Sequence, residues 1–399
     1  IFSLFLQPLG ELLKGLNTIF TSQGTLVSDY TALAGVGPAL FNASIVAIIG
    51  CIIIRVHKLP CDGASISAVF TMFGFGLFGK NMWSILPIIA GTYLYSVIKQ
   101  VSFRKHLYVG LFGTALAPLV TFVAYGLGWG VLGGIGIGLV TGIILPSLAV
   151  QALRFHQGYN IYNVGFTAGI AGFLVLSILR FYGFDTEGLS IWGTDDHMML
   201  RLFSLVSSVI MLTIGLVMYD KDTSYRKLLR ESGQLRTDFM EKYGFSKTWI
   251  NMGIIGLIGC AYVELVGGVY NGPVVGGIFT MIAFASLGKH PLNCAPIMFG
   301  VFLATILPRS ILSASDPAAL LAALFGTTLA PVAGRFGPLI GTFAGFVHIT
   351  IVSQVGILHG GLNLYNNGFA GGFVAAIFVA FIKGFKRRVD YLDLEVDDR

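Results

Sequence analysis

Two lysines stand out because each one ends a similar apolar stretch. Lys80 ends "FTMFGFGLFGK" and Lys289 ends "FTMIAFASLGK". A lysine beside the end of a broken membrane helix can attract an anionic or polar solute, and the freed backbone groups there can coordinate it. A lysine in this position can also extend to the lipid interface and cap a helix C-terminus. The sequence allows both roles, and the direction of the side chains will decide between them.

The same two stretches offer hydroxyl and aromatic side chains. Thr71 and Thr280 can line a pore or form hydrogen bonds within their own helix. Phe75 and Phe284 can form an apolar constriction around a permeating solute, or pack against lipid and protein. We include all four residues among the candidates for substrate binding.

A second repeated motif carries amides and a histidine. It reads "HQGYNIYNVGFTAG" from His156 and "HGGLNLYNNGFAGG" from His359. Buried amides must find hydrogen-bond partners, so these can ring a solute path or complete loops and caps at the interface. The two histidines are candidates for proton coupling because histidine titrates near neutral pH, and a structural role at a helix boundary is the alternative. The candidate substrate-binding amides are Asn160, Asn163, Asn363 and Asn366.

Motifs of known catalytic sites are absent from the sequence. It contains no HExxH, no GxSxG and no Walker loop. Its histidines and acidic residues are too scattered for a metal site, and its four cysteines form no CxxC pair. We therefore expect no enzyme activity, no catalytic residues, no metal and no cofactor. Without an ATP-binding module, active transport has to use a gradient, such as one of protons or sodium ions.

The elements that must position these residues are membrane helices. Hydrophobic residues make up 55% of the chain and charged residues 11%, against about 25% charged residues in soluble domains. Such a chain cannot cover its surface with ionic groups, so we expect an all-α polytopic membrane protein. The predicted spans are Gly37–Ile54, Met82–Val97, Leu107–Leu127, Val131–Ala149, Tyr162–Leu179, Leu202–Met218, Trp249–Val266, Pro291–Ile306, Ala318–Val332, Leu339–Val355 and Gly368–Ile382.

Two further apolar runs, Gly63–Phe78 and Gly272–Leu287, are shorter. Each corresponds to about 24 Å of helix at 1.5 Å per residue, which falls short of the hydrocarbon core of about 30 Å. We predict half-helices or re-entrant segments, which a membrane tolerates where they are buried in protein or line a wet cavity. The mixed charges and leucines of Asp220–Lys247 predict a surface helix outside the membrane, and a solvated connector is the alternative.

The chain contains an internal duplication. The two lysine stretches align without gaps at an offset of 209 (279 − 70). Two further blocks follow in the same order: "LFGTALAP" from Leu111 matches "LFGTTLAP" from Leu324, and the histidine motifs align at an offset of 203 (359 − 156). We predict a first membrane repeat at 1–190 and a second at 191–399, the second including a cytoplasmic connector at 220–247.

The charges of the loops predict that the two repeats face opposite sides of the membrane, since basic residues mark cytoplasmic loops. The first repeat has basic loops near its start, and its far end is acidic, with Asp185, Glu187, Asp195 and Asp196. The equivalent loops of the second repeat lack this basic excess, and its far end is basic, with Lys383, Lys386, Arg387 and Arg388. Inverted repeats with broken helices are typical of transporters and channels, whose sites lie near the membrane midplane at the repeat interface.

The chain resembles two families. The three repeated blocks resemble a duplicated bacterial integral membrane family of unknown function, and this resemblance covers most of the chain but implies no activity. "YNG" at Tyr270–Gly272, followed by a small-residue apolar run, resembles the urea transporter family more weakly. That resemblance implies inverted repeats with re-entrant segments and a narrow pore through each subunit of a trimer. The first half reads "CDG" at Cys61–Gly63, and the proline-containing filter motif of that family has no clear counterpart.

These observations predict a multi-pass transporter that moves a small polar or anionic solute across the bacterial inner membrane, through a site between two inverted repeats. A passive channel for urea or a similar amide is one alternative, and a non-transporting scaffold or membrane enzyme is another. We expect a homo-oligomer in the lipid bilayer, with a proton or sodium ion as the coupling ion and no nucleic-acid partner.

Overall fold

The computed structural model describes residues 2–24, 27–186, 190–195, 198–235 and 237–386. Within this part of the chain the regular structure is helical, apart from two isolated β-bridges. Four of the charges used to orient the repeats, Glu187, Asp196, Arg387 and Arg388, lie outside the described residues. The helices are α1 (Phe2–Leu6), α2 (Leu9–Thr21), α3 (Tyr30–Ala34), α4 (Val36–Val56), α5 (Gly63–Gly76), α6 (Met82–Ile98), η1 (Phe103–Lys105), α7 (Leu107–Gly113), η2 (Thr114–Leu116), α8 (Ala117–Thr121), η3 (Phe122–Gly126), α9 (Gly130–His156), α10 (Asn163–Phe181), α11 (Met198–Val217), α12 (Tyr225–Leu228), α13 (Phe239–Leu265), α14 (Gly272–Phe284), α15 (Pro291–Ile306), α16 (Pro317–Gly326), η4 (Thr327–Leu329), α17 (Ala330–Phe336), α18 (Pro338–His359) and α19 (Asn366–Lys386).

Nine helical segments of the described chain are long and apolar enough to span a bilayer, which confirms the prediction of an all-α polytopic membrane protein. The nine are α4, the segment from α7 to η3, α9, α10, α11, α13, the segment from α16 to α17, α18 and α19. Two of the predicted spans, Met82–Val97 and Pro291–Ile306, correspond instead to the shorter apolar helices α6 and α15. The 17 residues of α6 extend only about 26 Å, which is less than the hydrocarbon core of about 30 Å. α6 is one arm of a hairpin.

α5 and α6 form this hairpin, and α14 and α15 form its counterpart. Arg104, which follows α6, donates a hydrogen bond to the carbonyl of Lys58, which precedes α5. Tyr108 at the start of α7 lies 2.8 Å from Ser65 in the first turn of α5. Both outer ends of the hairpin therefore lie on one side of the molecule, and its tip at residues 77–81 is buried inside the protein. This is the re-entrant arrangement that the short apolar runs predict.

The two repeats share an unusual backbone kink. α3 and α4 meet at Gly35, which has a φ of 93°, and α13 contains the equivalent kink at Gly244, with a φ of 79°. Residues other than glycine rarely adopt such positive φ angles. Asp29 and Asp238 precede the two kinked segments at equivalent positions, and each carboxylate caps the helix that follows it. α13 is therefore the counterpart of α3 and α4 together.

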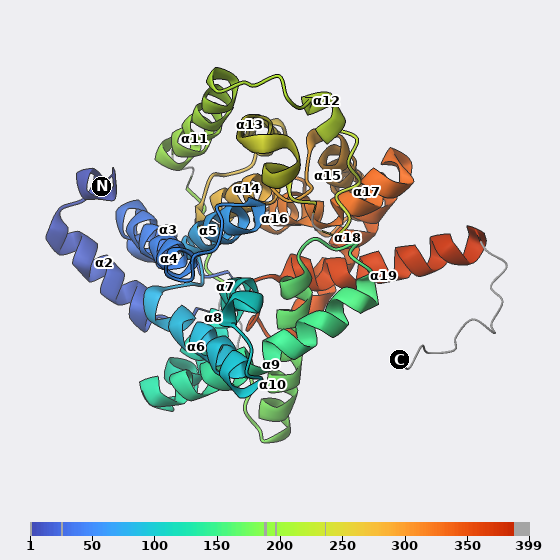
Figure 1. The fold of residues 1–399 in the computed structure, drawn as a ribbon. Helices are drawn as coiled ribbons and strands as arrows, with labels where there is room; N and C mark the ends of the chain where they lie inside the picture. Colours follow the sequence, from blue (N-terminus) through green and yellow to red (C-terminus); the bar gives the residue numbers. More distant parts are fainter. Residues whose placement is uncertain (1, 25–26, 187–189, 196–197, 236, 387–399) are drawn as a thin grey trace.

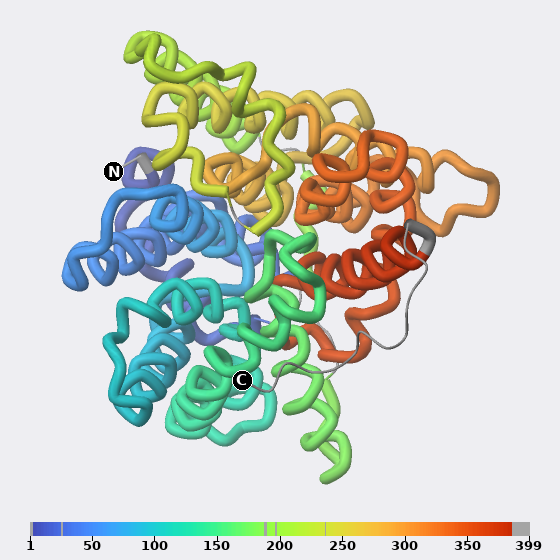
Figure 2. Tube along the Cα trace, turned by 45° about the vertical axis from the view of Figure 1, so that its right-hand side comes forward, coloured from blue at the N-terminus to red at the C-terminus, as the bar shows by residue number. Residues whose placement is uncertain are grey.

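α5 and α14 lie side by side at the centre of the molecule (Figure 1) and run antiparallel. Ser286, just after α14, donates a hydrogen bond of 2.9 Å to the carbonyl of Gly63 at the start of α5. A Cβ atom on Gly74 would lie 2.8 Å from the carbonyl oxygen of Gly276, so the two backbones touch. Corresponding helices of the two repeats thus run in opposite directions, as an inverted repeat requires. In Figure 2 the blue-to-cyan part of the chain and the yellow-to-red part occupy different sides of the molecule and meet at its centre.

α11 joins the two repeats and packs along α13. A Cβ atom on Gly253 would lie 2.5 Å from the backbone nitrogen of Leu212, so the two helices approach closely at a small residue. The connector 220–247 forms α12 and the first turns of α13 rather than a long surface helix, so that prediction is wrong. A hydrogen bond of 2.7 Å from Thr223 to the Tyr243 carbonyl holds the connector against α13 instead.

Candidate functional site

An asparagine from a neighbouring helix holds the tip of each hairpin. Asn42 on α4 donates hydrogen bonds to the carbonyl oxygens of Gly76 and Lys80, at 2.7 and 2.8 Å. At the tip of the other hairpin, Asn251 on α13 donates hydrogen bonds to the carbonyl oxygens of Ala285 and Lys289, at 2.8 and 2.7 Å. Carbonyl groups at a buried helix end need partners, because water does not reach them. The asparagines supply these partners and fix the loops from which the two lysines project.

Each lysine joins a threonine of its own repeat to a tyrosine of the other repeat. The resulting triads are Lys80, Thr114 and Tyr365, and Lys289, Thr327 and Tyr162. Nζ donates to the threonine Oγ1 at 2.8 Å in the first triad and at 2.7 Å in the second. Lys80 donates to its tyrosine hydroxyl at 2.6 Å, and Lys289 bonds its tyrosine in the same way. The triads therefore tie the two repeats together.

Both lysine side chains are completely buried, so neither caps a helix at the lipid interface. Neither takes part in any of the ion pairs found among the described residues. Lys247 is also buried, but its ammonium group contacts the carboxylate of Asp220. Buried charges are usually paired in this way. The two triads thus hold two buried amines without an acidic partner in the described part of the chain.

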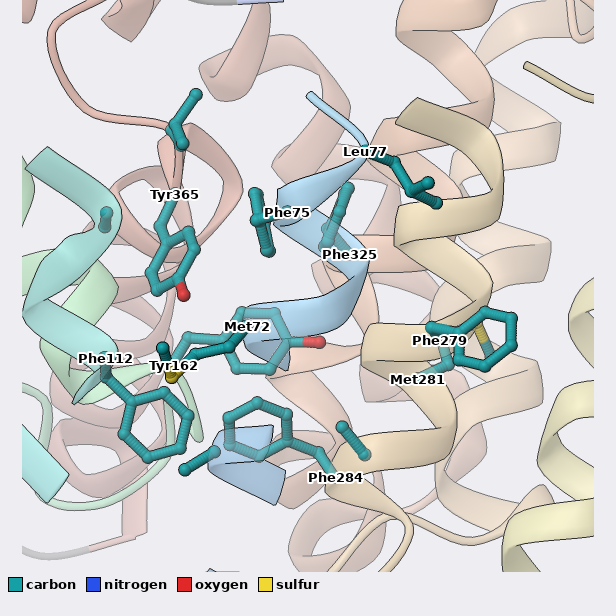
Figure 3. Packing of buried hydrophobic residues seen from close by; sticks show 14 of the residues in the cluster. Met72, Phe75, Leu77, Phe112, Tyr162, Phe279, Met281, Phe284, Phe325 and Tyr365 are labelled. Carbon is teal, nitrogen blue, oxygen red and sulfur yellow. The ribbon is translucent and has the colours of Figure 1, made fainter. Parts of the chain in front are cut away.

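The tyrosine of each triad also belongs to an aromatic trio, and Figure 3 shows the rings of both trios. The trios are Phe75, Phe325 and Tyr365, and Phe284, Phe112 and Tyr162. The ring of the hairpin phenylalanine lies 5.2 and 4.4 Å from the other two ring centroids in the first trio, and 5.6 and 4.6 Å in the second. Each lysine Nζ lies near its tyrosine ring, 4.6 Å from the centroid for Lys80 and 4.3 Å for Lys289. These contacts stabilise a cation without neutralising its charge.

A narrow cavity lies between the two trios, with walls from both hairpins and from the starts of α10 and α19. About 30 Å³ of it is open to water-sized molecules, which is room for one or two waters. None of the residues in its wall is acidic. Of the residues predicted to bind substrate, Thr71, Phe75, Asn163, Thr280 and Phe284 line it. Lys80 and Lys289 reach it only through Tyr365 and Tyr162, which do line it.

The two equivalent threonines of the cavity differ in their hydrogen bonding. Thr280 Oγ1 donates a bond of 2.7 Å to the carbonyl of Gly276 in its own helix. Thr71 Oγ1 is buried and has no hydrogen-bond partner. A buried hydroxyl left without a partner costs about 1–3 kcal/mol. Thr71 is therefore available to a solute in the cavity.

α10 and α19 begin at the cavity, and their first turns contribute to its wall through Asn163, Gly165, Asn367 and Gly368. No side chain caps the start of α10. The free N–H groups at a helix start give it a partial positive charge. The two helices cross at this point, since a Cβ atom on Gly165 would lie 3.2 Å from the Cα of Gly368. Both helix starts therefore direct positive potential toward the same small volume.

Asn160 and Asn363, which we predict to bind substrate, fix this crossing and do not line the cavity. Asn160 donates a bond of 2.9 Å to the Gly368 carbonyl, and Asn363 donates one of 3.4 Å to the Gly165 carbonyl. Each also accepts a bond from the backbone N–H two residues further along the chain. Their amides are thus engaged with the backbone of both repeats.

The two histidines of the repeated motif lie behind the helix starts. His156 Nε2 bonds Asn163 Oδ1, and His359 Nε2 bonds Asn366 Oδ1, both at 2.9 Å. Both histidines are buried, and neither they nor Asn366 line the cavity. The proton-coupling candidates thus hold the first residues of α10 and α19 in place.

Sequence reasoning missed the residues that hold the lysines and the hairpins. Thr114 and Thr327 lie in the repeated LFGT block, and the two triad tyrosines lie in the repeated amide motif. Asn42 and Asn251 align at the same offset of 209 as the lysines. Each pair occupies equivalent positions of the two repeats, and this recurrence is the signal that could have identified them.

Comparisons with known proteins identify a family but no activity. A family model described as "protein of unknown function (DUF1576)" matches residues 9–181 and 220–384. The two matched segments are two copies of one domain, and they leave out α11. No curated protein and no solved structure matches the chain, so a relationship to urea transporters has no support from these comparisons. Among the described residues, no group of three or more potential metal ligands occurs.

Proposed function

We propose that this protein transports a small anion. The chain belongs to the family of unknown function, whose model matches more than half of its length. The family implies no activity, so the proposal is argued from geometry. The observation that carries the proposal is the pair of buried lysines without acidic partners, one on each side of a cavity between inverted repeats. A buried ammonium group is costly unless a counter-charge accompanies it. A bound anion would supply that charge to either lysine.

The wall of the cavity favours an anion over a cation. Its polar groups include the hydroxyls of Thr71, Tyr162 and Tyr365 and the amide of Asn367, and no carboxylate is among them. Each tyrosine oxygen accepts a hydrogen bond from a lysine, which leaves the O–H of the tyrosine as a donor. The lysines thus act through the tyrosines, by orienting their hydroxyls and by setting a positive potential. Sites of this kind, at helix starts near the membrane midplane, bind anionic groups in other inverted-repeat transporters.

A neutral amide such as urea, or a role as a scaffold, fits the geometry less well. Urea would leave both lysine charges uncompensated. A scaffold would gain stability from apolar packing at this position, where the protein keeps an unpartnered Thr71 hydroxyl. The small volume of the cavity favours a monatomic or small planar anion.

We place the protein in a bacterial inner membrane, as a homo-oligomer without catalytic function.

Flux measurements on the purified full-length protein in liposomes test this proposal. We expect the protein to carry nitrate, chloride or formate and not sodium, and to lose this flux when Lys80→Met and Lys289→Met are combined. Lys247→Met is the matched control, because it removes a buried lysine that an acid already neutralises, and it should retain flux. Absence of anion flux in the wild-type protein, or undiminished flux in the double variant, would contradict the proposal. Lysine-independent urea flux would favour the channel for neutral solutes.

A further inference from the structure

The two repeats differ at three equivalent positions that lie around the second triad. The second repeat carries Cys294, His348 and Asn367 where the first carries Ile85, Leu145 and Val164. The first pair aligns at the offset of 209 and the other two at the offset of 203. A polar cluster in one repeat thus takes the place of an apolar cluster in the other.

Packing confirms that Leu145 and His348 are equivalent in space. A Cβ atom on Gly113 would lie 2.5 Å from Leu145 Cδ1, and a Cβ atom on Gly326 would lie 2.8 Å from His348 Cδ2. Gly113 and Gly326 each precede the threonine of a triad. Leu145 and His348 therefore fill the same place behind the two triads, and only the second repeat has a titratable group there.

His348 reaches the cavity through a single hydrogen bond. Its Nε2 lies 3.0 Å from Oδ1 of Asn367, and Asn367 lines the cavity. An amide oxygen only accepts hydrogen bonds, so Nε2 carries a proton and Nδ1 is the nitrogen with the free lone pair. Nδ1 is buried and has no hydrogen-bond partner. The ring can therefore take up a proton at Nδ1 without breaking its bond to Asn367.

Few charged groups surround this histidine. α18 packs against α10, α15, α16, α17, α19 and η4, and none of these helices contains an acidic residue. Their titratable and basic residues, with those of α18, are Arg180, Cys294, Arg335, His359, Lys383 and Lys386. Lys289 lies just before α15 and bonds Thr327 beside Gly326. A proton on His348 would thus add positive charge next to the second triad, with no carboxylate on the surrounding helices to neutralise it.

We propose that His348 couples anion transport to protons: it takes up a proton at Nδ1 when the anion binds and releases it when the anion leaves, so that the two move together. This inference rests on the proposed function. Anion binding favours the imidazolium form, and the imidazolium form favours anion binding, because linkage is reciprocal. The first repeat has no counterpart of this group, so one proton accompanies each anion.

The test uses nitrate as the probe, because nitrate does not itself titrate near neutral pH. Proteoliposomes containing the full-length protein and a trapped pH indicator would report nitrate and proton fluxes together. We expect an inward proton gradient to speed nitrate entry, up to about tenfold per pH unit for a single titrating group, with one proton entering per nitrate. His348→Leu installs the residue that the first repeat has at this place, and this variant should carry nitrate without proton movement.

Two further variants keep the test decisive. His348→Gln retains a donor for Asn367 but does not titrate, so it should also uncouple nitrate from protons even if the leucine variant folds poorly. His57→Gln alters a histidine at the end of α4, where the ring bonds the Ile53 carbonyl, and should leave coupling unchanged. Proton-coupled nitrate flux in both His348 variants, or uncoupled flux in the wild-type protein, would overturn the coupling alone. A wild-type protein that carries no anion would overturn the proposed function as well.

Discussion

The two repeats hold the same triad in opposite orientations, and the residues behind the triads differ. Lys80 and Lys289 bond equivalent threonines and equivalent tyrosines, whereas Leu145 lies behind the first triad and His348 behind the second. Under the proposed transport, features present twice are those that a solute would meet from either side of the membrane. A feature present once can impose a direction or a coupling. In the function that we propose, this comparison separates residues that bind the anion from a residue that drives its movement.

The largest effect is expected when both copies of the shared feature are removed. Lys80→Met combined with Lys289→Met should lower anion flux by at least about 100-fold, since a hydrogen bond to a charged group contributes about 1.5–3 kcal/mol and two such groups are lost. Initial rates of nitrate uptake in proteoliposomes measure this. Comparable uptake by the double variant and by Lys247→Met would show that the two triads do not act on the solute.

Removing one copy at a time tests whether the triads are equal partners. Lys80→Met and Lys289→Met should each reduce nitrate flux by roughly 10- to 100-fold, on the same energetic grounds. The two rates should agree at high pH and separate at low pH, where a protonated His348 supports only the second triad. Rates measured for both variants at several pH values would test this. A constant ratio of the two rates across pH would argue against any difference between the repeats.

The supports of the hairpins should be equally important in both repeats. Asn42→Ala and Asn251→Ala each leave two buried carbonyl groups without their amide donor. We expect each variant to lose about 1–3 kcal/mol of stability, seen as lower unfolding temperatures in detergent. Replacement of Asn17, an exposed residue of α2, by alanine is the control. A loss confined to one of the two variants would mean that the hairpins are not equivalent supports.

The threonines of the cavity provide a smaller, asymmetric effect. Thr71→Val removes the unpartnered hydroxyl, so it should weaken nitrate binding by about 2- to 10-fold, the value of an ordinary hydrogen bond, without loss of stability. Thr280→Val removes a hydroxyl that already bonds Gly276, so it should leave nitrate affinity nearly unchanged. Half-saturation concentrations for uptake measure both. A stronger effect at Thr280 than at Thr71 would reverse our assignment of the two hydroxyls.

The sequence predicted the spanning helices that segments of spanning length confirm, the duplication and the two short segments Gly63–Phe78 and Gly272–Leu287, because apolar length and repeated blocks are local or directly comparable signals. Met82–Val97 and Pro291–Ile306 were predicted as full spans, because hydropathy cannot tell a hairpin arm from a short crossing. The pairing of Lys80 with Tyr365 could not be predicted, since it joins residues 285 positions apart across the repeat interface. The prediction of a surface helix at 220–247 was wrong because Tyr225 and Leu228 pack against Phe239 and Tyr243 of α13, a tertiary contact that composition does not reveal.

The His348–Asn367 pair shows most clearly what the sequence could not disclose. Nothing in "GFVHITIV" distinguishes this histidine from a packing residue, and the motif histidines His156 and His359 drew attention as repeated features. Their bonds to Asn163 and Asn366 are matched in both repeats, as expected for structural supports. The significance of His348 depends on its place behind the second triad, which becomes visible only when the helices are placed against each other.

The smallest expected effect concerns Lys247, whose equivalent in the first repeat is Pro38. Its hydrogen bond to Asp220 holds the pKa of that carboxyl below the usual value. A depressed folded-state pKa means that the pair stabilises the protein above the ordinary pKa of aspartate, about 3.9, and loses this contribution as the pH falls through the lower value. Asp220→Asn should therefore lower the unfolding temperature in detergent at pH 6, and the difference between the two proteins should shrink as the pH falls below the ordinary pKa of aspartate. Because Asp220 is partly exposed, the shift should be small and should shrink with added salt. A difference that did not shrink on acidification would show that the asparagine disturbs something other than this ion pair. Lys247 would then no longer serve as the neutralised buried lysine with which the two triads are compared.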